Sequence, residues 1–212
     1  VSVDTHIAHF CTDRYRMLAV PPRGRPRAFD RDAALDTAVH LFWERGYEGT
    51  SLADLTAAMG INAPSFYAAF GNKEALFREA VERYGQLFGH PPAHGGTARE
   101  IVEHWLRDTA REYVVAGRPR GCLVVLAALT CTDRNRAVRE FLAAKRRDAL
   151  AALAAALRAT AEEDLDVPAA VRFYGTVLHG LAIEARDGAE QADLDAVIDA
   201  ALSVWPRFRR GG

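Results

Sequence analysis

The chain has 212 residues, with 27 Lys and Arg against 28 Asp and Glu, so its formal net charge is −1. A balance this even gives no argument from charge for a nucleic-acid, membrane or acidic partner. Half of the residues are hydrophobic, which is enough for a core in one large domain or two small ones. No apolar run approaches transmembrane length, and residues 1–20 lack the basic, apolar and small-residue order of a signal peptide. We therefore expect a cytoplasmic protein with no membrane partner.

The three cysteines, Cys11, Cys122 and Cys131, are odd in number, widely spaced and without a CxxC motif. This pattern favours reduced thiols over a disulfide scaffold. Buried thiols on apolar helices are the simpler interpretation. A redox-sensing role for Cys122 and Cys131 stays open as the alternative.

In chain order, the first predicted helix covers residues 30–45. Apolar residues recur at i, i+4 and i+7 from Leu35 to Phe42, and a glycine follows the last of the periodic residues. A second helix is predicted to begin after Ser51, because the aspartate three positions later completes a variant of the capping box. Gly60 ends this helix.

The rest of the chain also predicts helices. Asn62 is the predicted cap of a short third helix that has Pro64 in its first turn. Further amphipathic helices are expected at 73–88, 97–116, 120–130, 134–161, 168–187 and 193–208. Alternating β patterns and internal repeats are absent from the sequence. The predicted fold class is all-α.

The third helix has two distinct faces. At about 100° per residue, Phe66 and Phe70 share one face and should point into the core, while Ser65 and Tyr67 face outward. Two short helices joined by a three-residue turn make a helix-turn-helix, whose second helix can lie in a DNA major groove. Geometry alone leaves an ordinary helical hairpin open as the alternative.

Four motifs follow one another between residues 42 and 77: FWERGYEGTS, AAMGI, SFYAAF and GNKEALF. Each is weak alone, but in this order they resemble the DNA-binding domain of the tetracycline-repressor (TetR) family of bacterial regulators. The resemblance covers about fifty residues, and later helices agree with the family only in number, length and order. It implies a homodimer that binds double-stranded operator DNA, responds to a small-molecule effector and needs no cofactor.

The resemblance also implies roles in DNA binding. Tyr67 and Lys73 match the family's usual phosphate-contacting residues, and a phenol and a long cation suit a phosphate chemically. Ser51 would present the N-terminus of the second helix to another phosphate. The base contacts are expected from the exposed start of the third helix, at Asn62, Ala63, Pro64 and Ser65. Because no Arg, Lys or Gln stands on this face, thymine-methyl contacts and DNA shape are the expected basis of specificity.

Residues 23–27 read RGRPR, a basic segment directly before the first helix. Gly and Pro between the arginines favour an extended arm that fits a minor groove, with Arg25 and Arg27 as the contacting residues. A solvated tail is the alternative. Residues 1–22 are expected to be a disordered tail, or sequence upstream of the native start.

We expect residues 23–72 to form the DNA-binding domain, including this arm, and residues 73–212 to form a helical domain for ligand sensing and dimerisation. Large, soft or polar side chains expected around a cavity are Tyr84, His104, Trp105, Tyr113, Cys122, Leu126, Phe141 and Phe173, with His179 as a second polar group. The residues expected at a four-helix dimer interface are Tyr174, Leu178, Leu181, Leu194, Ile198, Leu202 and Trp205.

Two other classes of protein are alternatives to this interpretation. An enzyme is disfavoured, because no Ser–His–Asp order, HExxH, P-loop or GxGxxG motif occurs, and no catalytic residue is predicted. His90 and His94 lie in a Pro/Gly-rich loop without a supporting carboxylate, so no metal site is predicted. A constitutive architectural DNA-binding protein stays open. The sequence does not distinguish a repressor from an activator, or name the effector.

Overall fold

The computed structural model describes residues 30–92 and 95–209. Contacts divide the chain into Val1–Asp30 and Arg31–Gly212, and only the second unit contains described helices. Within the described residues this unit has no β-strand, and the predicted all-α class is confirmed. Its α-helices are α2 (Arg31–Arg45), α3 (Leu52–Met59), α4 (Ala63–Phe70), α5 (Lys73–Phe88), α6 (Ala98–Tyr113), α7 (Leu123–Leu129), α8 (Arg136–Arg158), α9 (Val167–Asp187) and α10 (Gln191–Ser203).

Local signals set the ends of the first helices, as predicted. Ser51 accepts a hydrogen bond from the N–H of Asp54, whose carboxylate accepts the N–H of Ser51, so the capping box before α3 is complete. Gly60 ends α3 with φ 67°, a left-handed conformation that costs glycine little. The side-chain oxygen of Asn62 accepts the N–H of Ser65 at 2.9 Å and caps α4.

The last predicted helix, 193–208, divides into two pieces in the structure. α10 ends at Ser203, and the 3-10 helix η2 (Trp205–Phe208) follows it. Pro206 has no N–H to donate to the preceding turn, so the α-helical ladder cannot continue through it. Another 3-10 turn, η1 (Asp133–Asn135), precedes α8. No helix in the described ranges is long and apolar enough to cross a membrane.

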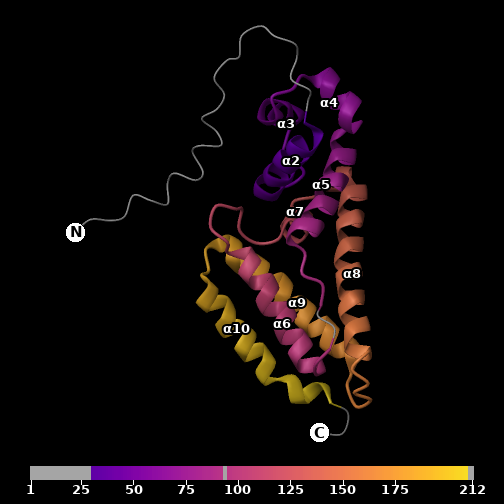
Figure 1. The fold of residues 1–212 in the computed structure, drawn as a ribbon, viewed down its shortest axis with the longest axis vertical. Coiled ribbons are helices and arrows are strands. Elements are labelled where there is room, and N and C mark those ends of the chain that lie inside the picture. The colour runs from indigo at the N-terminus through magenta and orange to yellow at the C-terminus, as the bar shows by residue number, and fades with distance from the viewer. Residues whose placement is uncertain (1–29, 93–94, 210–212) are drawn as a thin grey trace, which may run out of the picture. The chain divides into compact units, whose positions relative to one another are not determined.

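Figure 1 shows α2, α3 and α4 at one end of this unit and α6, α9 and α10 at the other, with α5 leading from the first group toward the second. Each group has its own hydrophobic core. The first core is centred on aromatic side chains of α2, α4 and α5, and its largest buried members are Phe42, Phe66 and Phe77. The second core joins α6, α9 and α10 to the C-terminal half of α8.

The short helix α7 belongs to both cores. Leu123 and Ala127 are buried in the first core, and Val125 is buried in the second. The seven-residue helix α7 therefore packs between the two groups of helices and contacts both cores.

Hydrogen bonds join the end of α2 to the segment just before α7 and to α9. The indole Nε1 of Trp43 donates a hydrogen bond to the carbonyl oxygen of Gly121 at 3.1 Å, and the Arg186 guanidinium donates to the carbonyl oxygen of Glu44. Gly121 has φ 77°, and a Cβ at this position would collide with the carbonyl oxygen of Ala182. Only glycine therefore fits at this junction.

Candidate nucleic-acid interface and ligand cavity

The helix pair α3–α4 presents the predicted DNA-binding face to solvent. Phe66 and Phe70 are 0% and 3% exposed, whereas Tyr67 between them is 52% exposed. The Phe66 ring meets the Tyr67 ring edge-on, with centroids 5.7 Å apart. Ala63, Pro64 and Ser65 at the start of α4 are also exposed. The helix α4 therefore packs on the core through the Phe66 and Phe70 rings, while its first turn and the Tyr67 phenol are exposed to solvent.

The two polar residues at the helix starts are engaged in capping. Asn62 uses its side-chain oxygen for the cap, which leaves its amide hydrogens for another acceptor. The hydroxyl of Ser51 donates to the Asp54 carboxylate at 2.5 Å, and the hydrogen bonds from Ser51 lower the pKa of Asp54. A carboxylate thus lies beside the place where a phosphate was expected, which makes Ser51 a weaker candidate than Tyr67.

Lys73, which is predicted to contact a phosphate at the edge of the groove, turns its ammonium group toward the protein at the start of α5. Its Nζ donates to the carbonyl oxygen of Thr50 at 2.8 Å and lies 4.2 Å from the centre of the Tyr47 ring. Burial lowers the pKa of this ammonium group. Lys73 therefore ties α5 to the residue preceding the α3 cap, and only its remaining hydrogens could reach a phosphate. Arg25 and Arg27 lie outside the described residues.

A cavity of about 460 Å³ is lined by the C-terminal half of α5 together with α6, α7, α8 and α9. Four of the predicted ligand-binding residues line it, Tyr84, Trp105, Tyr113 and Cys122, together with His179. Burial raises the pKa of both tyrosines well above the usual value, and the adjacent Cys122 thiol adds to the shift. The hydroxyls are therefore neutral donors inside a largely apolar space.

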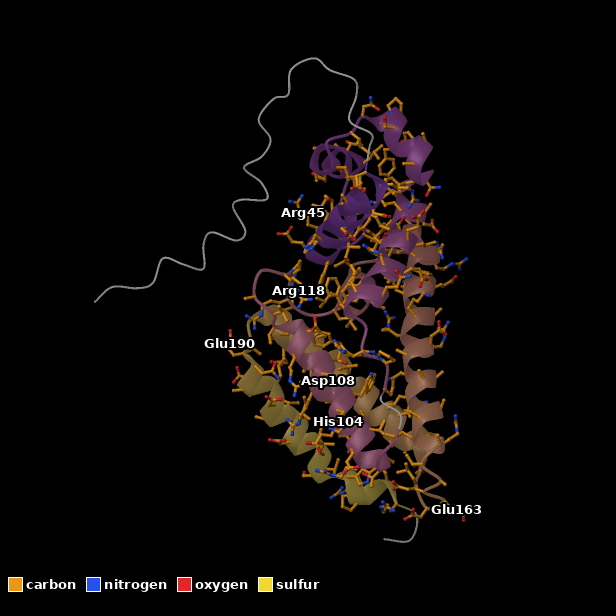
Figure 2. All side chains as sticks on the ribbon, viewed as in Figure 1. Arg45, His104, Asp108, Arg118, Glu163 and Glu190 are labelled. Atoms are coloured by element: carbon orange, nitrogen blue, oxygen red, sulfur yellow. The ribbon has the colours of Figure 1, made fainter. Side chains whose placement is uncertain are left out.

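The other four predicted residues do not line this cavity. His104 is exposed on α6 (Figure 2), because the helix turns the neighbouring Trp105 inward instead. The Phe141 ring packs under Arg78, 4.6 Å from its guanidinium carbon, and belongs to the first core. Phe173 is 37% exposed and packs edge-on against Tyr174. Leu126 points toward Gly121. The structure therefore does not place these four side chains at the wall of this cavity.

Several lining residues could not be predicted from the sequence. They come from five helices and the segment after α5, and include His90, Thr109, Val124, Lys145, Arg146, Leu150 and Leu178. An arginine or lysine on an amphipathic helix usually marks the solvent side, so Lys145 and Arg146 could be placed at the cavity only by the packing of α8.

A more open cleft of about 580 Å³ lies where α2 approaches the segment between α6 and α7, and Arg118 stands on that segment (Figure 2). Its arginines are bound to protein groups. Arg118 pairs with Glu112 at 2.7 Å, Arg120 pairs with Glu190 at 3.2 Å, and Arg186 donates to the Glu44 carbonyl. The apolar cavity is therefore the better candidate for a ligand.

The seven residues predicted at the dimer interface are buried inside a single chain. None of them is more than 7% exposed, and the Tyr174 hydroxyl donates to the carbonyl oxygen of Ala201 within the same protomer. The main apolar stripes of α9 and α10 pack against α6 and against each other, so these side chains have little surface left for a partner. The large apolar side chains that these two helices expose are Phe173, Ile183 and Val197.

The described cysteines differ in their surroundings. Cys131 is buried, its Sγ–H donates to the Ala127 carbonyl oxygen at 3.3 Å, and burial raises its pKa. Cys122 is partly buried, and neither forms a disulfide in the part of the chain that the structure describes. Within the same ranges no group of three or more His, Cys, Asp or Glu side chains could hold a metal ion.

Comparison with known proteins agrees with this geometry. Residues 34–80 match the family model described as bacterial regulatory proteins of the tetR family. The HTH-type transcriptional repressor ComR of Escherichia coli (strain K12) is 35% identical over 206 residues, which cover 88% of this chain and 93% of ComR. The uncharacterized HTH-type regulator YezE of Bacillus subtilis (strain 168) is 29% identical over 191 residues, covering 85% of this chain and 98% of YezE.

A solved structure gives the same result. The TetR family regulator CifR, as a cysteine mutant complexed with 26-bp double-strand operator DNA, shares 45% identity with this chain. The TM-score is 0.78, over 86% of this chain and all of that one. The helix-turn-helix fold and these similarities define a DNA-binding transcriptional regulator rather than an enzyme. The chain belongs to the TetR family, whose members act as homodimers on double-stranded operator DNA.

Proposed function

We propose that this protein is a cytoplasmic repressor that a small, mostly apolar molecule releases from its operator. The observation that carries the proposal is the position of α5, which begins at Lys73 beside the α3–α4 face and reaches the cavity at Tyr84. Residues 23–72 would bind DNA, and residues 73–212 would bind the effector and the second subunit. ComR is named a transcriptional repressor, which supports repression rather than activation.

DNA contacts are proposed for the exposed start of α4 and for Tyr67. Asn62, Ala63, Pro64 and Ser65 would face the bases, mainly through apolar contacts and DNA shape. Ser51 and Lys73 would approach the flanking phosphates, although their polar groups already have protein partners. Arg25 and Arg27 would supply the minor-groove arm.

Replacing Tyr67 with Phe should weaken binding to operator and to random duplex DNA by the same factor, about fivefold for the loss of one hydrogen bond worth about 1 kcal/mol. The slope of log K against log salt should stay unchanged, because a phenol releases no counterion. Lys73→Ala should flatten this slope by about one unit per subunit. Fluorescence anisotropy over a salt series measures both, and a Tyr67→Phe variant with altered sequence preference would remove the phosphate role.

Two contacts between the cavity wall and α2 would transmit a conformational change caused by the effector. Tyr84 lines the cavity and meets the Trp43 ring edge-on, with centroids 4.9 Å apart. Trp43 is also hydrogen-bonded to Gly121, the neighbour of the cavity residue Cys122. A ligand that displaces Tyr84 or Cys122 would therefore move α2 and α5 together and change the separation of the two DNA-binding heads. Paired half-sites need heads about 34–36 Å apart, so a small mismatch weakens binding.

The test begins with selection of bound sequences from random duplexes, which should return two symmetric half-sites about one helical turn apart. Compounds that raise the melting temperature of the free protein are then added to the operator complex. We expect them to lower operator affinity by roughly 5–150-fold, and operator to weaken compound binding by the same factor. A compound that binds the cavity and leaves operator affinity unchanged would contradict ligand control, as would tight operator binding by a monomer.

A further inference from the structure

Arg146 is a charged residue on the wall of an otherwise largely apolar cavity. It projects from α8, and the Trp105, Leu150 and Leu178 side chains line the same space. Its Nη1 donates to the carbonyl oxygen of Val124 at 3.0 Å. That carbonyl lies inside α7, so Arg146 is not capping a helix end. Within the described residues no carboxylate lies within ion-pair distance of its guanidinium group.

The other charges around the cavity are already balanced. Lys145 forms an ion pair with Glu82. His90 lies 3.7 Å from Glu112, which also pairs with Arg118 at 2.7 Å. These pairs leave the Arg146 charge without an anion among the described residues that line the cavity.

The Arg146 side chain is partly buried. Burial lowers its pKa, although an arginine side chain stays protonated at neutral pH. Burial, and then the Arg146 charge, lower the pKa of the neighbouring His179, so this imidazole is neutral there at pH 7. A partly desolvated cation without an anion is a costly arrangement that a bound anion relieves.

Arg146 has further N–H groups that could donate hydrogen bonds to such an anion. A guanidinium carries five N–H donors in a planar fork, and the structure commits one of its nitrogens to Val124. The fork matches a carboxylate or sulfonate, which accepts two parallel hydrogen bonds. The buried Thr109 Oγ1 also lines the cavity and has no hydrogen-bond partner among the described residues, so it offers a further polar contact.

We propose that the effector is an amphipathic organic anion, whose carboxylate or similar head group binds Arg146 while its apolar body packs against Trp105, Leu150 and Leu178. The inference rests on the proposed function, in which this cavity receives the effector, and it names the chemical class. A volume of about 460 Å³ is within the range of small-molecule sites and excludes large lipids.

Two fluorescent probes with the same aromatic frame test the charge directly. 1-Anilinonaphthalene-8-sulfonate is anionic, and N-phenyl-1-naphthylamine lacks the sulfonate and is neutral. Arg146→Met should weaken the anionic probe about tenfold or more and change the affinity of the neutral probe less than twofold. Arg146→Lys should keep part of the preference. The matched control is Arg147→Met, because Arg147 is the next residue of α8, is exposed and lies outside the cavity.

Equal binding of the anionic probe to Arg146→Met and to the parent would overturn the proposal. If Arg146→Met does not fold, competition on the parent protein decides: octanoate should displace the anionic probe at lower concentration than octanamide, and equal displacement would also overturn it. Operator affinity is measured in parallel. An Arg146-dependent anion that leaves operator affinity unchanged would uphold the anion site and contradict effector control, so the two proposals can fail separately.

Discussion

Placing a glutamate at Ile183 and another at Val197 should convert the protein to a monomer and lower its operator affinity by about 10²–10⁴-fold, the usual gain from linking two binding heads. These side chains are 39% and 45% exposed, on α9 and α10. A homodimer of this family needs an apolar surface, and the inward stripes of both helices are already used within the protomer. Near a two-fold axis each new carboxylate would be desolvated close to its own copy.

Sedimentation velocity gives the oligomeric state, and a gel-shift titration gives the affinity. Leu87→Glu is the matched control, because Leu87 is 48% exposed and lies on α5. It should leave the protein dimeric. If the Ile183→Glu, Val197→Glu double variant stayed dimeric with operator affinity intact, the interface would have to lie on another surface.

Truncating Phe66 to Ala should lower the free energy of unfolding by about 3–5 kcal/mol, the usual cost of removing a buried aromatic side chain. Phe66 is 0% exposed and its ring centroid lies 5.8 Å from that of the tilted Phe70 ring, so the substitution removes much of the packing of α4. Operator binding should weaken as well, since this packing positions the exposed first turn of α4.

Urea denaturation followed by circular dichroism measures the change. Tyr67→Ala, one residue along the same helix and 52% exposed, is the control and should cost only about 0.5 kcal/mol. A Phe66→Ala variant that loses less than about 1 kcal/mol would show that α4 is held by other contacts.

Signals close together in the chain predicted the helix-turn-helix correctly. The Ser51 cap, the Gly60 stop and the Asn62 cap each depend on side chains within three residues of the helix end, so the sequence alone contains them. The inward direction of Phe66 and Phe70 follows from helical periodicity over the same short distance.

The contacts between distant helices could not be predicted in the same way. α9 and α10 carry apolar residues on more than one face, and periodicity does not say which face meets the chain's own core and which meets a partner. The stripes that contain Leu178 on α9 and Ile198 on α10 are predicted to face a partner, yet these residues are buried within the protomer. Lys73 and Arg146 are similar cases, because Thr50 and Val124, which accept their hydrogen bonds, lie more than twenty residues away.

Because α7 packs in both hydrophobic cores, its sequence limits how the protein can evolve. Because Leu123 and Ala127 stabilise the DNA-binding helices while Val125 stabilises the body, the two groups of helices share structural support and should melt as one cooperative unit. A mutation that reshapes the cavity near α7 therefore also alters how firmly the DNA-binding head is folded. New effector specificities in this lineage would have to arise by substitutions that keep the seven residues of α7 packed on both sides.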